Sequence, residues 1–322
     1  MNVLVTGGAG FIGSHFILHA LEEDPSITIV NVDRLTYAAD LSYLQQVEKD
    51  GRYLFVQADI CDHDRMLQLV YDHRIEAIVN FAAESHVDRS IQDSAPFLRT
   101  NITGTHSLLE VARKCGGIRY VQISTDEVYG SLSFDDLRLF TEQSVLQPNN
   151  PYSASKAGAD LLVRSYYETH GLPVNITRCS NNYGPHQHAE KLLPTLIERS
   201  NKQLSLPIYG DGKNIRDWLY VKDHVQAILL VLQKGTIGDV YNIGGTNEWA
   251  NNEVAKHVLD YFGLPHSNIS YVSDRPGHDQ RYAIDASKIQ QQLGCSLRQR
   301  LSKVSLKRLN GTLKEGIIRE YP

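Results

Sequence analysis

Three glycines near the start of the chain constrain its fold more than any other feature. Gly7, Gly10 and Gly13 stand at Gly-x-x-Gly-x-x-Gly spacing, between an apolar segment that ends at Val5 and a helix-like segment. The absent side chains permit a tight turn and a close approach of the backbone to a pyrophosphate, whose charge would meet the positive end of the following helix. The spacing and its context therefore predict a dinucleotide-binding turn. A tight turn without a ligand is the alternative.

Short apolar runs alternate with helix-like segments through the first half of the chain. The runs expected to form buried strands are 2–5, 28–32, 54–56, 77–81, 120–123 and 174–176. The clearest helical segments cover 67–70 and 107–112. This alternation predicts an α/β fold with a Rossmann-type, doubly wound parallel sheet. Ligands of such a sheet bind beyond the carboxyl ends of its strands.

The alternation becomes irregular after about residue 180, where loops rich in Gly and Pro appear at 207–212 and 274–278. We therefore expect two domains. Residues 1–180 would form the dinucleotide-binding domain with the catalytic residues, and 181–322 would form mainly a smaller α/β substrate-binding domain. Segments around 215–245 are expected to return to the first sheet.

Composition excludes several classes of protein. The formal net charge of -5 and the pI near 6.2 give no general electrostatic footprint for nucleic acid. No apolar run reaches 18 residues, so no membrane span is expected. The four cysteines are scattered without a Cys-x-x-Cys pair, which argues against a metal site or a disulfide framework. A reducing cytoplasm is the expected location.

Asp33 determines the expected choice of dinucleotide. It follows the second expected strand, about 20 residues after the last glycine, where a carboxylate accepts from a ribose hydroxyl and repels a 2'-phosphate. NAD is therefore favoured over NADP. NADP remains a possible cofactor because of Arg34, since an arginine here could pair with that phosphate.

Residues 124–156 hold two pairs of groups with different chemistry. Tyr152 and Lys156 are spaced i, i+4, so on a helix they share one face, and the ammonium is expected to lower the pKa of the phenol toward neutrality. The phenolate would be a base for a sugar hydroxyl. Asp126 and Glu127 add an acid and a base that hydride transfer alone does not need, although they could simply solvate a loop.

Several strings narrow this reading to a family. They are Leu-Thr-Tyr-Ala at 35–38, Ala-Ala-Glu-Ser-His-Val-Asp-Arg-Ser at 82–90, Ser-Thr-Asp-Glu-Val-Tyr-Gly at 124–130, Asn-Asn-Tyr-Gly-Pro at 181–185, and the segment 207–218. With the glycine motif and Tyr-x-x-x-Lys, they closely resemble the nucleotide-sugar 4,6-dehydratases of the extended short-chain dehydrogenase/reductase family. The resemblance covers nearly the whole chain. The Thr-Asp-Glu triplet separates it from the 4-epimerases of that family, which usually lack the acid pair.

The resemblance implies a redox-neutral conversion of dTDP-glucose to a 4-keto-6-deoxy sugar nucleotide. Tyr152 would remove the proton of the sugar 4-hydroxyl, oriented by Thr125, while a hydride moves from carbon 4 to NAD. Glu127 would then take the proton of carbon 5, and Asp126, protonated, would help the 6-hydroxyl leave as water. The hydride would return to carbon 6, and NAD would stay bound throughout.

The family match also assigns binding residues. The implied cofactor residues are Gly7, Gly10, Phe11, Ile12, Gly13, Asp33, Leu35, Thr36, Asp59, Ile60, Ala82, Ala83, Tyr152 and Lys156. The implied substrate residues are Ser85, Asp88, Arg89, Asn182, Lys191, Leu192, Pro207, Tyr209, Arg216, Asn251, Arg275 and His278. No metal is implied. A homodimer is expected, with helices near 95–112 and 154–167 as its face.

Two departures from the family pattern stand out. Trp249-Ala250 precede Asn251 where a Thr-Asn step is usual, and 307–322 lack an aromatic-rich ending, which puts terminal packing in doubt. Three alternatives stay open at this stage. They are UDP-glucose as the substrate, a nucleotide-sugar 4-epimerase, and a catalytically silent NAD-binding protein.

Overall fold

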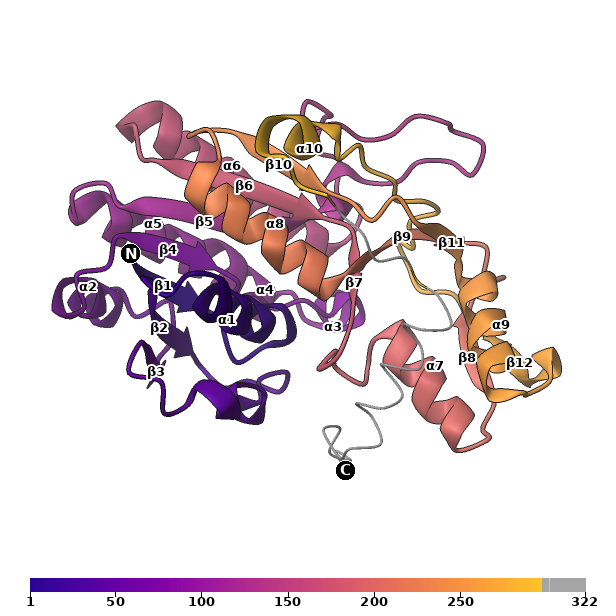
Figure 1. The fold of residues 1–322 in the computed structure, drawn as a ribbon. Helices are drawn as coiled ribbons and strands as arrows, with labels where there is room; N and C mark the ends of the chain where they lie inside the picture. The colour runs from indigo at the N-terminus through magenta and orange to yellow at the C-terminus, as the bar shows by residue number, and fades with distance from the viewer. Residues whose placement is uncertain (297–300, 302–322) are drawn as a thin grey trace.

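A seven-stranded parallel sheet forms the centre of the molecule (Figure 1). The computed structural model describes residues 1–296 and 301. The strand order is β10-β6-β5-β4-β1-β2-β3, and every neighbouring pair is parallel. The bounds are β1 Asn2–Thr6, β2 Thr28–Asp33, β3 Tyr53–Gln57, β4 Ala77–Asn80, β5 Arg119–Thr125, β6 Val174–Cys179 and β10 Val240–Ile243. The six expected strands and the doubly wound parallel sheet are confirmed.

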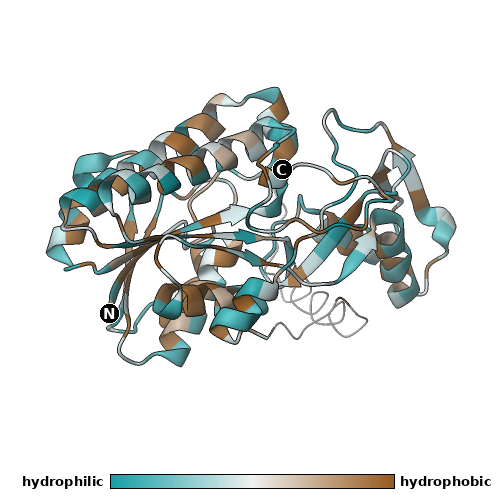
Figure 2. Cartoon of the chain, turned by 90° about the horizontal axis from the view of Figure 1, so that it is seen from above, coloured by the Kyte–Doolittle hydropathy of each residue, from teal (hydrophilic) through white to brown (hydrophobic). Residues whose placement is uncertain are grey.

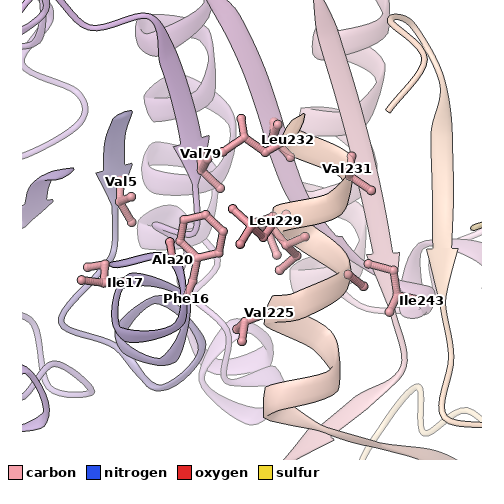
Figure 3. Close-up of a cluster of buried hydrophobic side chains, with 14 of the residues drawn as sticks. Val5, Phe16, Ile17, Ala20, Val79, Val225, Leu229, Val231, Leu232 and Ile243 are labelled. Carbon is pink, nitrogen blue, oxygen red and sulfur yellow. The ribbon is translucent and has the colours of Figure 1, made fainter. Parts of the chain in front are cut away.

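Helices cover both faces of this sheet, as Figure 2 shows from above. On one face lie α1 (Phe11–Glu23), α8 (Val221–Lys234) and α10 (Ser287–Leu293); on the other lie α2 (His63–Asp72), α5 (Thr105–Lys114) and α6 (Pro151–His170). Figure 3 shows Phe16 of α1 and Leu229 of α8 in the cluster that joins these two helices to the sheet. The apolar faces of the helices thus close one core on each side.

A smaller group of elements lies beyond the carboxyl ends of the strands (Figure 1). Its three-stranded sheet has the order β11-β9-β7, with β7 at Asn181–Tyr183, β9 at Ile215–Tyr220 and β11 at Glu248–Ala250. Two further strands, β8 (Leu206–Tyr209) and β12 (Ile269–Val272), pair in parallel. Helices α7 (Leu192–Asn201) and α9 (Asn251–Phe262) pack on these strands around a separate apolar cluster.

Short helical segments connect the larger elements. They are η1 (Leu41–Val47), α3 (Val87–Gln92), α4 (Ala95–Phe97), η2 (Leu98–Gly104), η3 (Asp126–Tyr129) and η4 (His266–Asn268). In the described residues, no helix is long and apolar enough to cross a membrane, and no group of His, Cys, Asp and Glu is arranged to hold a metal ion. The four cysteines are free thiols. The atypical ending at 307–322 lies outside the described residues.

The glycine motif forms the turn between β1 and α1. Gly7 has a φ of +69°, which disfavours a side chain, and a Cβ there would lie 2.6 Å from the backbone N of Ala82. A Cβ on Gly13 would lie 2.4 Å from the carbonyl oxygen of Gly7. The start of α1 therefore sits against β1 and the end of β4 as closely as backbones can approach.

Replacing Gly7 with Ala should lower the free energy of unfolding by about 2 kcal/mol or more, because it combines a left-handed backbone with a backbone clash. Gly51→Ala is the matched control, since a Cβ there meets nothing within 4 Å. Denaturant unfolding of both variants checks the expectation. Equal midpoints for the two would show that the turn tolerates a side chain.

Candidate functional site

One cavity of about 330 Å³ lies beyond the carboxyl ends of the strands of the large sheet. Nineteen of the expected residues line it: Gly7, Gly10, Phe11, Ile12, Gly13, Asp33, Thr36, Asp59, Ile60, Ala82, Ala83, Ser85, Thr125, Asp126, Glu127, Tyr152, Lys156, Asn182 and Lys191. The topology thus brings the glycine turn, the Tyr-Lys pair and the acid pair around one space. This is the place where open α/β sheets bind their ligands.

The end of the cavity nearest α1 suits a dinucleotide. Gly10 caps α1 without a side-chain hydrogen bond, and the first turn of the helix carries no acidic residue. The amide groups and the positive helix end are therefore open to an anion. Asp33 stands nearby, where its two oxygens accept from the backbone N of Ala9 (3.0 Å) and of Leu35 (2.8 Å). This donor set and carboxylate fit the pyrophosphate and a ribose of NAD.

Leu35 contributes its backbone rather than its side chain at this end. It adopts a φ of +59° and does not line the cavity. Arg34 lines the cavity but forms an ion pair with Asp59 at 3.3 Å, and Asp59 also binds Arg99 at 2.8 Å. Arg34, the cation that could pair with the 2'-phosphate of NADP, thus has a carboxylate partner in Asp59, which follows β3.

The Tyr-Lys pair is positioned by the first turn of α6. Asn150 caps this helix, because its side chain accepts from the backbone N of Ser153 at 2.9 Å, and the Ser153 hydroxyl closes the reciprocal bond. Tyr152 and Lys156 are both buried on one helix face. The Lys156 Nζ donates to the carbonyl oxygen of Ile123 at 2.6 Å, which ties α6 to β5.

The expectation that the pKa of Tyr152 lies near neutrality is wrong for the protein by itself. Burial, followed by the charges of Glu127, Cys179 and Asp126, raises the pKa of Tyr152 well above its ordinary value. A hydrogen bond with Thr125 acts in the opposite direction. The physical reason is that two carboxyls and a desolvated cavity surround the phenol, so its ionisation requires added positive charge.

Asp126 and Glu127 lie side by side at the start of η3, but their surroundings differ. Burial, then the charges of Glu127 and Asp217, raise the pKa of Asp126 well above its ordinary value. Burial also raises the pKa of Glu127, but three cations oppose this shift: Arg275, Arg216 and Lys191. Asp126 is therefore the better proton donor and Glu127 the better acceptor.

Several buried polar atoms near the acid pair have no hydrogen-bond partner within residues 1–296 and 301. They include Ser124 Oγ, Asp126 Oδ2 and Glu127 Oε2, and the Nε of Arg275 is similarly unpaired. An unpaired buried polar atom is costly, and buried polar atoms normally have partners. This set of donors and acceptors suits a ligand rich in hydroxyl groups.

Four expected substrate residues meet outside the cavity lining. Asp88 accepts from the Tyr209 hydroxyl at 3.2 Å and pairs with Arg275 at 3.4 Å. His278 forms an edge contact with the ring of Tyr209 and pairs with Asp274 at 2.6 Å. These contacts join α3 to β8 and to the loop at 274–278 in the smaller group of elements.

Five further expected residues lie outside the cavity lining. Arg216 is buried over the ring of Tyr282, and Arg89 lies over the ring of Tyr37 and pairs with Glu190. Leu192 packs on the apolar cluster of the smaller group, Pro207 lies in β8, and Asn251 is buried at the start of α9. The departure at Trp249 affects packing, since its indole joins that cluster and donates to Asn247 at 2.9 Å.

The cavity also contains residues that sequence reasoning missed. They are Val32, Ala38, Ala39, Ala58, Glu84, Thr100, Ile123, Ser124, Cys179, Ser180, Asn181, Gln187, His188 and Glu190. Cys179 and Ser180 mark the end of β6, so the rule that ligands bind at strand ends could have found them. Glu190 carries no such signal. It lies within 3.5 Å of both His86 and His188, which come from different loops.

Comparisons with known proteins agree with this geometry. A family model described as GDP-mannose 4,6 dehydratase matches residues 4–305. A dTDP-glucose 4,6-dehydratase from Escherichia coli is 49% identical over 321 residues, covering 91% of this chain and 88% of the relative. A dTDP-glucose 4,6-dehydratase from Streptomyces venezuelae, solved with NAD and TYD bound, has a TM-score of 0.93 at 45% identity. The match covers 98% of this chain and 97% of that one.

The fold is shared more widely than the activity. A UDP-glucose 4-epimerase from Thermotoga maritima, solved with UDP-glucose, has a TM-score of 0.90 at 28% identity, covering 99% of this chain and 100% of that one. The backbone alone therefore does not separate the two reactions. The side chains at the cavity carry the distinction.

Proposed function

The chain belongs to the GDP-mannose 4,6 dehydratase family, and from this premise we propose that it converts dTDP-glucose to dTDP-4-keto-6-deoxyglucose and water. The reaction is that of an NAD-dependent hydro-lyase of nucleotide sugars. The observation that carries it is the acid pair at the start of η3, where Asp126 favours the protonated form and three cations favour ionised Glu127.

We assign the chain's residues to successive proton movements. Tyr152 accepts the proton of the sugar 4-hydroxyl, with Lys156 as the buried cation beside it and Thr125 as the orienting hydroxyl. NAD, when bound, would supply the redox chemistry, as the acceptor of a hydride from carbon 4 and the donor of a hydride to carbon 6. The ketone at carbon 4 acidifies carbon 5, so Glu127 can remove that proton while Asp126 donates to the departing 6-hydroxyl.

The remaining assignments complete the proposal. The glycine turn, Asp33 and the ends of the third and fourth strands hold NAD, and Arg216, Arg275 and Lys191 offer positive charge to the substrate diphosphate. Residues 1–180 act mainly as the NAD-binding domain and 181–322 mainly as the nucleotide-sugar domain. We further propose a homodimer through helices near 95–112 and 154–167, and a cytoplasmic location.

Incubation of the purified protein with dTDP-glucose in D₂O, without added reductant, tests the proposal. The expected product has lost one water and carries deuterium at carbon 5, because the proton taken by Glu127 exchanges with solvent. An unchanged mass with appearance of the galactose epimer would instead establish the 4-epimerase, in which the acid pair would be idle. Parallel incubation with UDP-glucose measures the preference for thymine over uracil in the substrate. A contact with the thymine methyl group contributes only about 1–3 kcal/mol to this preference.

Asp33→Asn should weaken NAD binding by about 10- to 100-fold, because the amide keeps the shape but loses a charged hydrogen bond to ribose. The preference for NAD over NADP should fall at the same time, since repulsion of a 2'-phosphate is removed. Titration of the cofactor-stripped protein with each dinucleotide measures both effects. Asp64→Asn, at an exposed site on α2, is the control. Unchanged NAD affinity in Asp33→Asn would remove Asp33 from the cofactor site.

A further inference from the structure

Helix α6 continues the functional face beyond Lys156. Tyr152, Lys156 and Asp160 stand four residues apart, so one face of the helix carries all three. Their exposed fractions are 8%, 4% and 1%, and the helix packs against β5 and β6. Asp160 is thus an ionisable group in the helix–sheet interface, one turn beyond the lysine.

Asp160 has a cationic partner on the sheet. Its Oδ2 forms an ion pair at 2.9 Å with the Nε of Arg178, whose side chain is also buried. Arg178 lies in β6 directly before the cavity residue Cys179 and opposite Ser124 in the ladder with β5. Its guanidinium also donates to the Tyr129 hydroxyl at 3.0 Å. The other carboxylate oxygen, Oδ1, has no hydrogen-bond partner within residues 1–296 and 301.

Asp160 is the carboxylate that faces two buried cations in this interface. Lys156 and Arg178 are two buried cations, and burial lowers the pKa of Lys156. The charge of Asp160 is the largest opposing influence, followed by that of Cys179. Burial raises the pKa of the Cys179 thiol to about 12, so it is neutral at ordinary pH.

The other ionisable groups near the lysine supply no equivalent anion. Tyr152 on α6 and Tyr129 on η3 are phenols whose pKa is raised by burial. Of the acid pair on η3, Asp126 favours its protonated form, and the charge of Glu127 already faces Arg275, Arg216 and Lys191. Asp160 therefore remains as the carboxylate that can stabilise the charged form of Lys156.

We propose that Asp160 is a positioning residue for the reaction, the buried counter-ion that keeps Lys156 charged, and that Arg178 competes with Lys156 for it. The inference rests on the proposed function, in which charged Lys156 favours ionisation of Tyr152. The bond from Lys156 to the Ile123 carbonyl needs only an N–H donor, so a neutral amine would keep the geometry while losing the charge. Asp160 thus stabilises the charge of the Lys156 amine, and the Ile123 carbonyl fixes the position of that amine.

Opposite pH shifts in two variants test the proposal. In Asp160→Asn, Lys156 loses its anion and releases its proton at lower pH, so the alkaline limb of kcat/KM for dTDP-glucose should move down by about one pH unit or more. In Arg178→Gln, the carboxylate is left to Lys156 alone, and the same limb should move to higher pH; an unmoved limb would refute the competition between Arg178 and Lys156. Asp160→Glu should restore the wild-type limb. A purely structural pair would lower activity or stability in both variants without these shifts, which would overturn the proposal.

A paired variant covers the case in which a single change prevents folding. Asp160→Asn combined with Arg178→Gln leaves no uncompensated buried charge in the pair. Its alkaline limb should still lie below that of the wild type, because Lys156 lacks its anion; an unshifted limb contradicts the inference. Wild-type protein is assayed first. If it forms no keto sugar, the proposed function fails, whereas turnover without these shifts refutes the role of Asp160 alone.

Discussion

Tyr152→Phe should reduce turnover of dTDP-glucose by about 10²- to 10⁴-fold, the usual contribution of a positioned general base. The variant keeps the ring that packs near Phe97 but removes the phenolic oxygen that we propose as the acceptor of the 4-hydroxyl proton. Because oxidation at carbon 4 comes first, every later step is lost with it. Reduced nicotinamide absorbance after rapid mixing of the NAD-loaded protein with substrate should fall in rate by the same factor.

Tyr166→Phe provides the matched control for this prediction. Tyr166 is buried on the same helix, but its hydroxyl donates to Glu110 at 2.6 Å and lies outside the cavity lining. Its turnover should stay near that of the wild type. If Tyr152→Phe forms reduced nicotinamide at the wild-type rate, Tyr152 is not the base.

Glu127→Gln should separate oxidation from elimination. The amide has the shape of the carboxyl but cannot take a proton, so exchange of the carbon 5 hydrogen with solvent should fall by about 10²- to 10⁴-fold. Slow oxidation at carbon 4 should persist, because Tyr152 and Lys156 are unchanged. Deuterium incorporation from D₂O into sugar recovered from the variant measures the exchange, and nicotinamide absorbance measures the oxidation.

Glu142→Gln is the comparison for Glu127→Gln. Its Oε1 accepts from the backbone N of Asn242 at 2.9 Å, a bond that the amide oxygen of Gln can keep. Exchange in this control should match that of the wild type. Wild-type exchange in Glu127→Gln would assign the carbon 5 base to another group and would leave the acid pair without its proposed division of roles.

Six of the seven strands of the large sheet could be predicted, because each is a short apolar run that is recognisable from its own residues. The apolar runs, the glycine turn and Asp33 at the end of β2 depend on neighbours within a few residues. The spacing of Tyr152 and Lys156 likewise fixes a shared helix face before any tertiary contact is known. For these features, local pattern and final structure agree.

Electrostatic character could not be predicted in the same way. The difference between the pKa shifts of Asp126 and Glu127 depends on Arg275 and Lys191, which approach Glu127 only after the chain has folded through the smaller group of elements. The pKa of Tyr152 was expected near neutrality because the pattern shows Lys156 and conceals the desolvation of the phenol. Glu190 was missed because its partners come from separate loops.

The return of β10 to the edge of the large sheet has a consequence for biosynthesis. Until a ribosome has made residues 240–243, β6 is an outer strand with one unpaired edge, and until residue 234 has been made α1 lacks the complete helix α8 as its neighbour. Such a free edge can pair with strands of other chains, and the apolar face of α1 is exposed to solvent. A fragment that ends near residue 180 should therefore aggregate rather than fold as a dinucleotide-binding module, because its sheet lacks β10 and its first helix lacks α8.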